Sequence, residues 1–589
     1  MARYMTYPLS EGERAQYENL LKDEDIKKFP KEVVRILFNR GVRTKDEMMM
    51  TLFGKMDNLH NVPMRDQKVF NKRLEIALQT NDHIVVMGDY DTDGCMATCV
   101  MVLGLRELGF RVDYYMNSRF KDGYGLKKAS VDVIREKYPD VSVIITVDNG
   151  IRAFEAIDYC NDLGIDVLVT DHHNPGELLP NALAVVDPKR DDCMYPFKGL
   201  CGAGVAWKLM FSLCNHLYPC NGFKRTNIRK LLWLVAIATV GDQVPLVDEN
   251  RIIVREMVRK FNDENYRLHN VFIKRIKELL NIEEFDSDTI GFYISPMINA
   301  MGRIEGNPLQ IVDAIVSNDI EIIDAIVQKM EELNQVRRDQ TSVQYEIAIK
   351  QLEEQGFMEN KQKGILVCSD EFTEGIIGIV ASRLTEKFNV PSIVLAPNED
   401  GTYKGSCRSI EGISIEGVLN ELSYYLIAFG GHDMAAGLSI SKDSIPLFKK
   451  RFLETVNEFD DSIFEDVVLI DLVIPQEGVS ASICKLIAEL GPYGNSFRKP
   501  KFFLKNFQVD YAKSIANKAE SFYVGKEGKT LRIVNPTGLV CIGFQAADKY
   551  KTLGEPDLVS MVGQPSLNYY NGNYYPQFVI EKEYLIKVK

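Results

Sequence analysis

The sequence predicts an α/β protein whose first folded domain is built on a parallel sheet. Between residues 82 and 186, short apolar runs alternate with helical patterns, which is typical of parallel strands covered on both faces. Each apolar run ends in polar residues, and the 589-residue chain is too long for one hydrophobic core. Because open parallel sheets bind ligands at the carboxyl ends of their strands, function is expected where these runs end.

Composition excludes several classes of protein. A hydrophobic content of 46% with 26% charged residues is ordinary for a soluble globular chain, and no apolar run reaches membrane-spanning length. The net charge of −13 argues against a uniformly basic surface that coats nucleic acid. Eleven cysteines without Cys-x-x-Cys spacing indicate reduced thiols, so we expect neither zinc nor disulfides. With no hydrophobic leader at the start, a cytoplasmic protein is expected.

The chain divides into five expected parts. Residues 1–70 have the pattern of short helices with mixed charge and no catalytic signature. After them, strands are expected at 84–88, 112–116, 141–147, 167–170 and 184–186, with helices at 95–108, 128–137 and 153–163 between them. The parts are 1–70 (N-terminal helical segment), 71–318 (catalytic domain), 319–357 (connecting helix), 358–464 (second α/β domain) and 465–589 (OB-like domain).

Three carboxylates follow the first apolar run at alternate positions, Asp89, Asp91 and Asp93. In an extended segment they would point to one face, where they repel one another unless cations neutralise them. An EF-hand begins in the same way, but Val100 stands where its bidentate Glu is required. A solvated acidic turn is the other alternative.

Further ligand types follow the later elements. Asp148 ends one apolar run, Asp171-His172-His173 ends the next, and Asp242 follows an apolar helix at 231–240. Carboxylates with imidazole suit two hard divalent ions, and Mn²⁺ or Mg²⁺ is favoured over zinc because no thiolate is placed to help. Two ions about 3.5–4 Å apart are the arrangement used for phosphoester or phosphoanhydride hydrolysis.

The second half contains a helix and another α/β domain. Residues 319–356 have a helical pattern that is polar on most faces, which suits a bridge between domains, with a coiled-coil seam as the rival interpretation. Strands at 364–368 and 392–396 flank a helix at 375–388. Ser406 and Arg408 follow, and His432 lies in a Gly-Gly-His segment that is either a phosphate-binding loop or a tight turn.

The tail from about 465 is rich in short strands around one helix at 480–490, which fits an OB-like barrel. Residues 498–505 mix cations with aromatic side chains, as a groove that follows a nucleic-acid strand would. Residues 569–575 predict a hairpin with an Asn571-Gly572 turn. Its tyrosines either stack on bases or pack across the hairpin.

The motifs Gly88-Asp89-Tyr90-Asp91-Thr92-Asp93-Gly94, Asp148-Asn149-Gly150, Asp171-His172-His173 and Asp242 resemble those of the DHH phosphoesterase superfamily. Within it, the chain resembles the RecJ single-stranded-DNA exonucleases over nearly its full length, although Gly241-Asp242-Gln243 departs from the expected Ala-Asp-Val. The resemblance implies a parallel-sheet DHH domain, a long helix, a DHHA1 domain and an OB-like barrel. It also implies roles for individual residues: metal binding by Asp89, Asp91, Asp93, Asp148, His172 and Asp242, with Asp148 bridging two ions; a catalytic contact of His173 with the scissile phosphate; and substrate binding by Arg119, Arg303, Ser406, Arg408 and His432.

The ligand pattern favours metal-assisted hydrolysis of a phosphoester. The resemblance implies more: a metal-dependent exodeoxyribonuclease that degrades single-stranded DNA 5′→3′ by two-metal-ion catalysis, for DNA repair and recombination. The expected partners are single-stranded DNA and a helicase or single-strand-binding protein, with the enzyme itself a monomer. Two alternatives stay open: a phosphodiesterase of the same superfamily that cleaves oligoribonucleotides or cyclic dinucleotides, and a catalytically silent replication scaffold. Loss of metal-binding residues would mark the scaffold, and every expected ligand is present.

Overall fold

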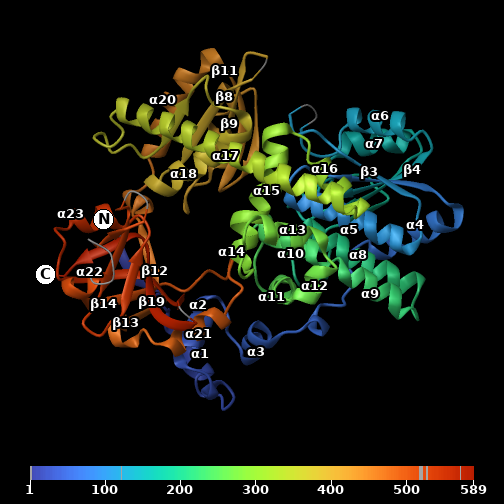
Figure 1. The fold of residues 1–589 in the computed structure, drawn as a ribbon. Coiled ribbons are helices and arrows are strands. Elements are labelled where there is room, and N and C mark those ends of the chain that lie inside the picture. The colour runs from blue at the N-terminus through green and yellow to red at the C-terminus, as the bar shows by residue number, and fades with distance from the viewer. Residues whose placement is uncertain are drawn as a thin grey trace.

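The computed structural model describes residues 3–120, 123–398, 400–515, 522–525, 528–570 and 572–588. Figure 1 shows a blue-green domain on the right, a yellow-orange domain at the top and an orange-red domain on the left that also holds the N-terminus. Helix α17 (Ile320–Glu354) joins the first two domains. The predicted fold class is confirmed: a parallel-sheet domain, a long helix, a second α/β domain and a β-rich tail.

The first domain contains a five-stranded sheet in which all neighbouring strands are parallel. Alternate residues of strand β2 (His83–Gly88) face opposite cores: Ile84 and Val86 pack against helices on one side, and Val85 and Met87 on the other. The strands in spatial order are β3 (Val112–Met116), β2 (His83–Gly88), β4 (Val141–Val147), β5 (Asp166–Thr170) and β6 (Ala184–Val186). One face is covered by α5 (Thr92–Leu108), α8 (Gly202–Leu217) and α10 (Leu232–Gly241), the other by α6 (Lys128–Lys137) and α7 (Phe154–Asp162).

The Asp-rich segment after β2 is not extended, and the expectation of an extended run through Asp93 was wrong. The strand ends at Gly88 and α5 begins at Thr92, so Asp93 lies in the first helical turn. Asp91 is the N-cap, and its side chain accepts a hydrogen bond from the Gly94 N–H at 3.0 Å. Asp is a strong helix N-cap, which explains why the chain turns here instead of continuing the strand.

The rest of the first domain is helical. Two π-helical segments, η3 (Ile290–Ile294) and η4 (Met301–Glu305), flank α15 (Ser295–Ala300), and α11 (Asp248–Phe261) packs beside α10. Among the described residues, no helix has both the length and the apolar character needed to cross a lipid bilayer.

Helix α17 contributes to two cores. Ile323, Val327 and Met330 in its first half pack in the core of the first domain, whereas Ala348 and Leu352 near its end pack in the second. Its 35 residues extend over about 52 Å at 1.5 Å per residue. One continuous helix therefore fixes the distance between the two α/β domains.

The second domain has a mixed sheet in which β7 and β8 are parallel and the other pairs antiparallel. The Gly-Gly-His segment, expected to be a loop or tight turn, is instead the edge strand β10 and forms a hairpin with β11. The strands in spatial order are β10 (Ala428–His432), β11 (Ala435–Ser441), β9 (Thr402–Arg408), β8 (Ser392–Pro397) and β7 (Ile365–Cys368), covered by α18 (Glu374–Phe388), α19 (Ile415–Glu421) and α20 (Ile445–Asn457).

The third domain has a seven-stranded sheet, and helix α21 (Ala481–Glu489) packs against it. Its hairpin is longer than predicted, because Tyr569 pairs with Tyr574 at the end of two long strands; Asn571 in the predicted turn lies outside the described residues. The strands in spatial order are β13 (Leu472–Pro475), β14 (Phe502–Gln508), β18 (Leu558–Tyr570), β19 (Asn573–Lys587), β17 (Val540–Gly543), β16 (Thr530–Val534) and β15 (Tyr523–Val524).

The N-terminal segment belongs to this third domain and is not only helical, contrary to expectation. Strand β1 (Arg3–Thr6) pairs in parallel with β12 (Val467–Ile470). Helices α1 (Glu11–Leu20) and α2 (Lys31–Asn39) share one hydrophobic core with the tail strands, to which Phe38 and Phe502 both contribute. The two ends of the chain are therefore parts of one folded unit.

Part of the basic and aromatic stretch at 498–505 is structural, whereas Arg498 and Lys505 are exposed, so a groove that follows a nucleic-acid strand stays a prediction. Phe502 and Leu504 are fully buried in that shared core. Lys499 pairs with Asp288 of the first domain, and Lys501 pairs with Glu581 at 2.6 Å. In a β-strand alternate residues face inward, which is why Phe502 and Leu504 are buried while Phe503 between them is only half-buried.

Candidate metal centre and substrate cleft

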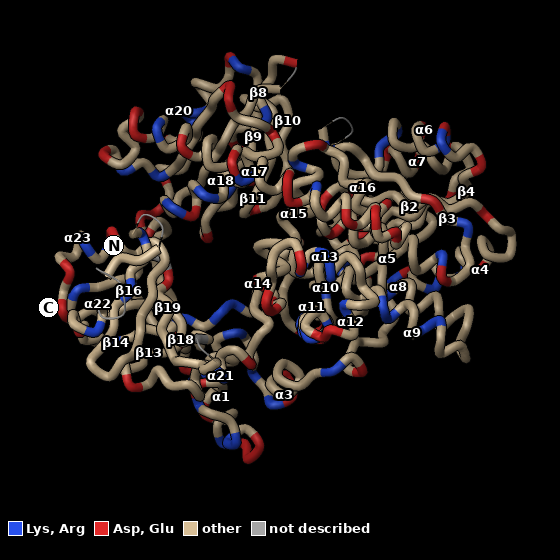
Figure 2. The backbone as a smooth tube through the Cα atoms, viewed as in Figure 1, with Lys and Arg blue, Asp and Glu red and all other residues tan. Residues whose placement is uncertain are grey.

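Seven polar side chains from four elements meet at the carboxyl edge of the first sheet. In Figure 2, red Asp and Glu segments gather beside the labels β2 and α5. Asp148 directly follows β4 in a left-handed conformation, with φ of 62°, and its N–H donates to the Thr170 carbonyl at 3.0 Å. The set is Asp89, Asp91, Asp93, Asp148, His172, His173 and Asp242.

His172 lies at the middle of this set. Its Nε2 is 3.0 Å from Asp148 Oδ1, 3.5 Å from Asp242 Oδ2 and 3.6 Å from Asp93 Oδ2. Three groups each have ligand atoms within 4.8 Å of one another: Asp148, His172 and His173; Asp93, His172 and Asp242; Asp89, Asp91 and Asp148. Asp148 and His172 each belong to two groups, which is the arrangement that adjacent cations need.

The first turn of α8 holds Asp93 in place. Backbone N–H groups of Gly202 and Ala203 donate to its two carboxylate oxygens at 2.6 and 2.8 Å. A Cβ on Gly202 would lie 2.6 Å from the Asp148 Cβ, so only glycine fits between the helix and that carboxylate. The partial positive charge of the helix N-terminus also favours the negative charge of Asp93.

Several buried ligand atoms of this set have no hydrogen-bond partner. They include Asp89 Oδ1, Asp148 Oδ1 and His172 Nε2; the short contact between the last two does not have hydrogen-bond geometry. Buried polar atoms without partners are costly, and bound divalent cations would satisfy all of them at once. Oxygen donors with one buried imidazole fit Mn²⁺ or Mg²⁺.

Burial and the closeness of these carboxylates also shift the pKa values of the side chains in the set. Burial and then the neighbouring carboxylates raise the pKa of Asp93 to about 7 and that of Asp242 to about 8. The pKa values of Asp89 and Asp148 are raised well above the ordinary value for the same two reasons. Burial, and then His173, lowers the pKa of His172 to about 3, so this imidazole is neutral and able to bind a metal.

Asp171 orients the pair of histidines. Its Oδ1 accepts from the His172 N–H at 2.7 Å and from His173 Nδ1 at 2.8 Å, while its Oδ2 accepts from the Ile151 N–H at 3.0 Å. Burial, the largest single cause, lowers the pKa of His173, but the hydrogen bond to Asp171 and the charges of Asp171, Asp242 and Asp93 together outweigh it and raise the pKa to about 9. The sequence placed Asp171 among the carboxylates at strand ends but did not predict that it orients the two histidines.

A group of arginines lies beside the metal centre, at the junction of the two α/β domains. The Arg119 guanidinium is 5.1 Å from the centre of the Tyr90 ring, and Arg303 donates to the Gly375 carbonyl at 3.2 Å. Burial, and then the charges of Arg119, Arg408 and Arg337, lower the pKa of Arg303 to about 10. Uncompensated guanidinium groups at this density indicate an anion site. Arg337 on α17 was missed because nothing local marks it.

Ser406 and Arg408 lie together on β9 at this junction. Arg408 donates from Nη1 to Ser406 Oγ and from Nε to Ser382 Oγ, both at 3.1 Å. Gly378 faces them, with its Cβ position 3.2 Å from Ser406 Oγ. These two predicted residues therefore join Arg119 and Arg303 in one region.

His432 lies two strands from Arg408 in the same sheet, because Ala435 of β11 pairs with both residues. It lines a cavity of ≈ 410 Å³ between the two domains, with His173 and Tyr124 on the opposite wall. Tyr124 contacts the Tyr90 ring edge to face at 6.5 Å and the His173 ring at 6.0 Å. The arginine group, the candidate metal centre and this cavity thus all lie along the junction between the two α/β domains.

Comparison with known proteins identifies the parts of the chain. Family models match residues 83–239 (DHH family, N-terminal domain), 361–459 (DHHA1 domain) and 470–582 (RecJ OB domain).

The single-stranded-DNA-specific exonuclease RecJ of Bacillus subtilis (strain 168) is 33% identical over 556 residues, which cover 93% of this chain and 67% of that protein. RecJ of Escherichia coli (strain K12) is 33% identical over 485 residues, covering 80% and 82%. The crystal structure of RecJ from Thermus thermophilus in complex with Mn²⁺ shares the fold, with a TM-score of 0.79 at 24% identity over 100% of this chain and 79% of that one.

Proposed function

Because the chain belongs to the RecJ family of single-stranded-DNA-specific exonucleases, we propose that it removes nucleotides one at a time from the 5′ end of single-stranded DNA, by two-metal-ion hydrolysis of phosphodiester bonds. The observation that carries this proposal is the position of the arginine group directly beside the unpartnered carboxylates and imidazole. An anion site next to a metal centre suits a substrate whose terminal phosphate is bound while its next phosphodiester is cut.

Mn²⁺ or Mg²⁺ would be held by Asp89, Asp91 and Asp148 on one side and by Asp93, His172 and Asp242 on the other. When bound, the two ions activate water and stabilise charge on the phosphoryl oxygens. Asp148, a member of the first group, has its Oδ1 3.0 Å from Nε2 of His172 in the second, which supports a role between the two sites. The exposed edge of His173, whose side chain is 39% accessible, faces the place where substrate would enter.

His173 would donate a hydrogen bond to the scissile phosphate. The hydrogen bond to Asp171 and the charges of the neighbouring carboxylates raise the pKa of its imidazole to about 9, so it is protonated at neutral pH, and a cationic donor binds a phosphate more strongly than a neutral one. Asp171 is therefore proposed as a positioning residue that acts through His173.

The 5′ phosphate would bind to the arginine group, and this gives the reaction its direction. Arg119, Arg303 and Arg408 offer several N–H donors, and Ser406 adds a hydroxyl. The nucleoside on the 3′ side of the scissile bond would occupy the ≈ 410 Å³ cavity between His173 and His432. Cleavage would then release one nucleotide and leave a new 5′ end to advance.

Observations also weigh on the alternatives. A silent scaffold is disfavoured, because no ligand of the expected set is missing. A substrate as small as a dinucleotide would leave the OB domain, residues 470–582, without a role. A longer single strand uses both regions.

The cellular setting follows from the same features. All eleven cysteines are free thiols, which supports a reducing, cytoplasmic compartment. Every proposed ligand comes from one chain, which supports action as a monomer. Because a duplex end does not offer a free 5′ strand, a helicase or single-strand-binding protein is the proposed partner, in DNA repair and recombination.

The test is digestion of an oligonucleotide labelled at either end, with Mn²⁺ or Mg²⁺. Early release of labelled mononucleotide from the 5′ label and late release from the 3′ label are expected, with loss of both in Asp148→Ala. Release from the 3′ label first would contradict the assignment of the arginine group. Hydrolysis of dinucleotides with longer DNA left intact would move the protein to the small-substrate alternative.

A further inference from the structure

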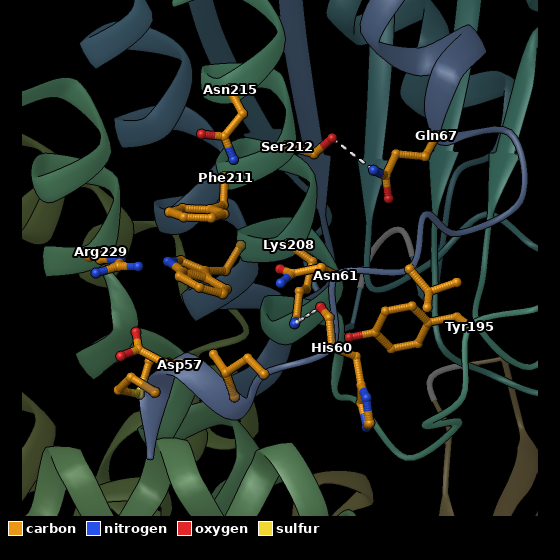
Figure 3. A pocket seen from close by; sticks show the side chains of 14 residues that line it. Asp57, His60, Asn61, Gln67, Tyr195, Lys208, Phe211, Ser212, Asn215 and Arg229 are labelled. Carbon is orange, nitrogen blue, oxygen red and sulfur yellow. Dashed lines mark hydrogen bonds between the residues drawn. The ribbon is translucent and has the colours of Figure 1, made fainter. Parts of the chain in front are cut away.

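A second cavity lies in the catalytic domain, apart from the metal centre (Figure 3). It encloses ≈ 380 Å³ between residues 56–62 and helices α8 and α9 (Gly222–Lys230). Its described lining contains none of the residues proposed to bind metal or the 5′ phosphate. The proposed nuclease reaction therefore does not account for it.

One wall of this cavity is aromatic. Phe211 stacks on Trp207, with ring centroids 5.3 Å apart and 19° between the planes. The Trp207 indole N–H donates to the Ile228 carbonyl at 2.9 Å, which fixes the orientation of the stack. Phe211 remains only partly buried, so it offers a flat surface on which a planar ring can stack.

The polar groups around this surface are partly uncommitted. Asn61 and Asn215 both line the cavity, and among the described residues their side-chain carboxamides have no hydrogen-bond partner. The Arg229 guanidinium lies 5.5 Å from the centre of the Phe211 ring, and none of the described carboxylates is within ion-pair distance of it. In Figure 3, Asn215 and Arg229 flank Phe211. Lys208 differs, because it is already bound to Glu249 and to the His60 carbonyl.

This combination matches the chemistry of one class of ligand. A stacking surface binds a nucleobase, and carboxamides donate to and accept from its edge. A free guanidinium binds a phosphate. We propose that this cavity binds a mononucleotide, with the base on Phe211 and the phosphate at Arg229.

The site has a direct connection to the metal centre. Trp207 and Phe211 lie on α8, and the first turn of the same helix donates the two N–H groups that hold Asp93. A nucleotide bound here contacts the helix that positions a proposed metal ligand. Mononucleotide is also what the proposed reaction releases, but binding at this cavity does not depend on that reaction.

Trp207 makes the proposal measurable, because it is one of only two tryptophans in the chain. In a Trp233→Phe background, with EDTA present to keep metal from the catalytic centre, 2′-deoxyadenosine 5′-monophosphate is titrated while Trp207 fluorescence is recorded. Saturable quenching is expected, half-maximal at a concentration on the order of 100 µM. Deoxyadenosine and inorganic phosphate, each lacking one half of the ligand, are expected to bind at least tenfold more weakly.

Variants separate this cavity from the catalytic cleft. Phe211→Leu and Arg229→Glu should each weaken quenching by about tenfold or more, whereas Arg408→Ala, in the proposed 5′-phosphate site, should leave it unchanged. Absence of saturable quenching up to 10 mM would overturn the proposal. So would quenching that survives both cavity variants or disappears in Arg408→Ala. Nuclease activity retained in Arg229→Glu would show that this variant is folded.

Discussion

Asp187 is a buried carboxyl group that the proposed reaction does not use. It follows β6, its Oδ2 has no hydrogen-bond partner, and its Oδ1 accepts from the Lys189 N–H at 2.7 Å. Burial raises its pKa to about 7. Because the ordinary value is 3.8, the folded protein keeps this proton between about pH 4 and 7 while the unfolded chain has lost it.

Stability contributed by that proton is complete below pH 4 and is lost as the pH rises through 7. Asp187→Asn should therefore raise the free energy of unfolding by about 2–4 kcal/mol at pH 9 and change it little at pH 4. Urea denaturation of both proteins at the two pH values, followed by circular dichroism, measures the difference. A variant that is less stable than the parent at pH 9 would show that the ionised carboxylate has a partner.

At the scale of elements, helix α8 is the part of the fold on which the metal centre depends most directly. Gly202 donates to Asp93 and packs against Asp148, so a methyl group there must displace either the helix or the carboxylate. Gly202→Ala should lower kcat/KM on single-stranded DNA by about 10²-fold or more, because displacements of about 1 Å have that effect on catalysis. The measurement is exonuclease kinetics in saturating Mn²⁺.

Gly222→Ala is the matched control. Gly222 also begins a helix, α9, but a Cβ there meets nothing within 4 Å. The kcat/KM of the Gly222→Ala variant on single-stranded DNA should equal that of the parent protein. Equal losses in both variants would mean that general destabilisation, and not the contact with Asp148, explains the effect.

At the scale of the whole molecule, the two chain ends act as one domain anchored to the first. Arg251 on α11 donates to the carbonyls of Leu490 at 2.5 Å and Pro492 at 2.6 Å, and to that of Thr51 at 3.1 Å. Burial lowers its pKa to about 10, and among the described residues carbonyl groups take the place of a carboxylate partner. One guanidinium thus ties the N-terminal segment, the tail and the catalytic domain together.

Truncation tests this arrangement. Removal of 465–589 alone should give aggregated protein, because the apolar faces of α1 and α2 lose their core. Removal of 1–55 together with 465–589 should give soluble protein that still hydrolyses dinucleotides but binds long single strands at least tenfold more weakly. Gel filtration and activity on both substrates measure this. A soluble product from the single truncation, or equal losses on both substrates, would contradict the proposed division of labour.

The sequence by itself determined the fold class and the positions of the candidate metal ligands. Apolar runs followed by Asp or His predict where strands end. In a parallel sheet the carboxyl ends of all strands lie at one edge, so local pattern and topology together are enough to predict that these residues meet. It also indicated the helix between the α/β domains, since a polar helix of that length needs two cores to stabilise it. The ligand roles of Asp89 to Asp242 remain predictions that mutation and metal binding must test.

Only the tertiary structure decided which distant surfaces meet. Periodicity reports that one face of a helix is buried but not what covers it, so the union of the N-terminal helices with the tail was invisible. The approach of Arg337 to Arg303 and the burial of Phe502 have the same origin. Each depends on contacts between residues far apart in the chain, and these are set by packing and not by local propensity.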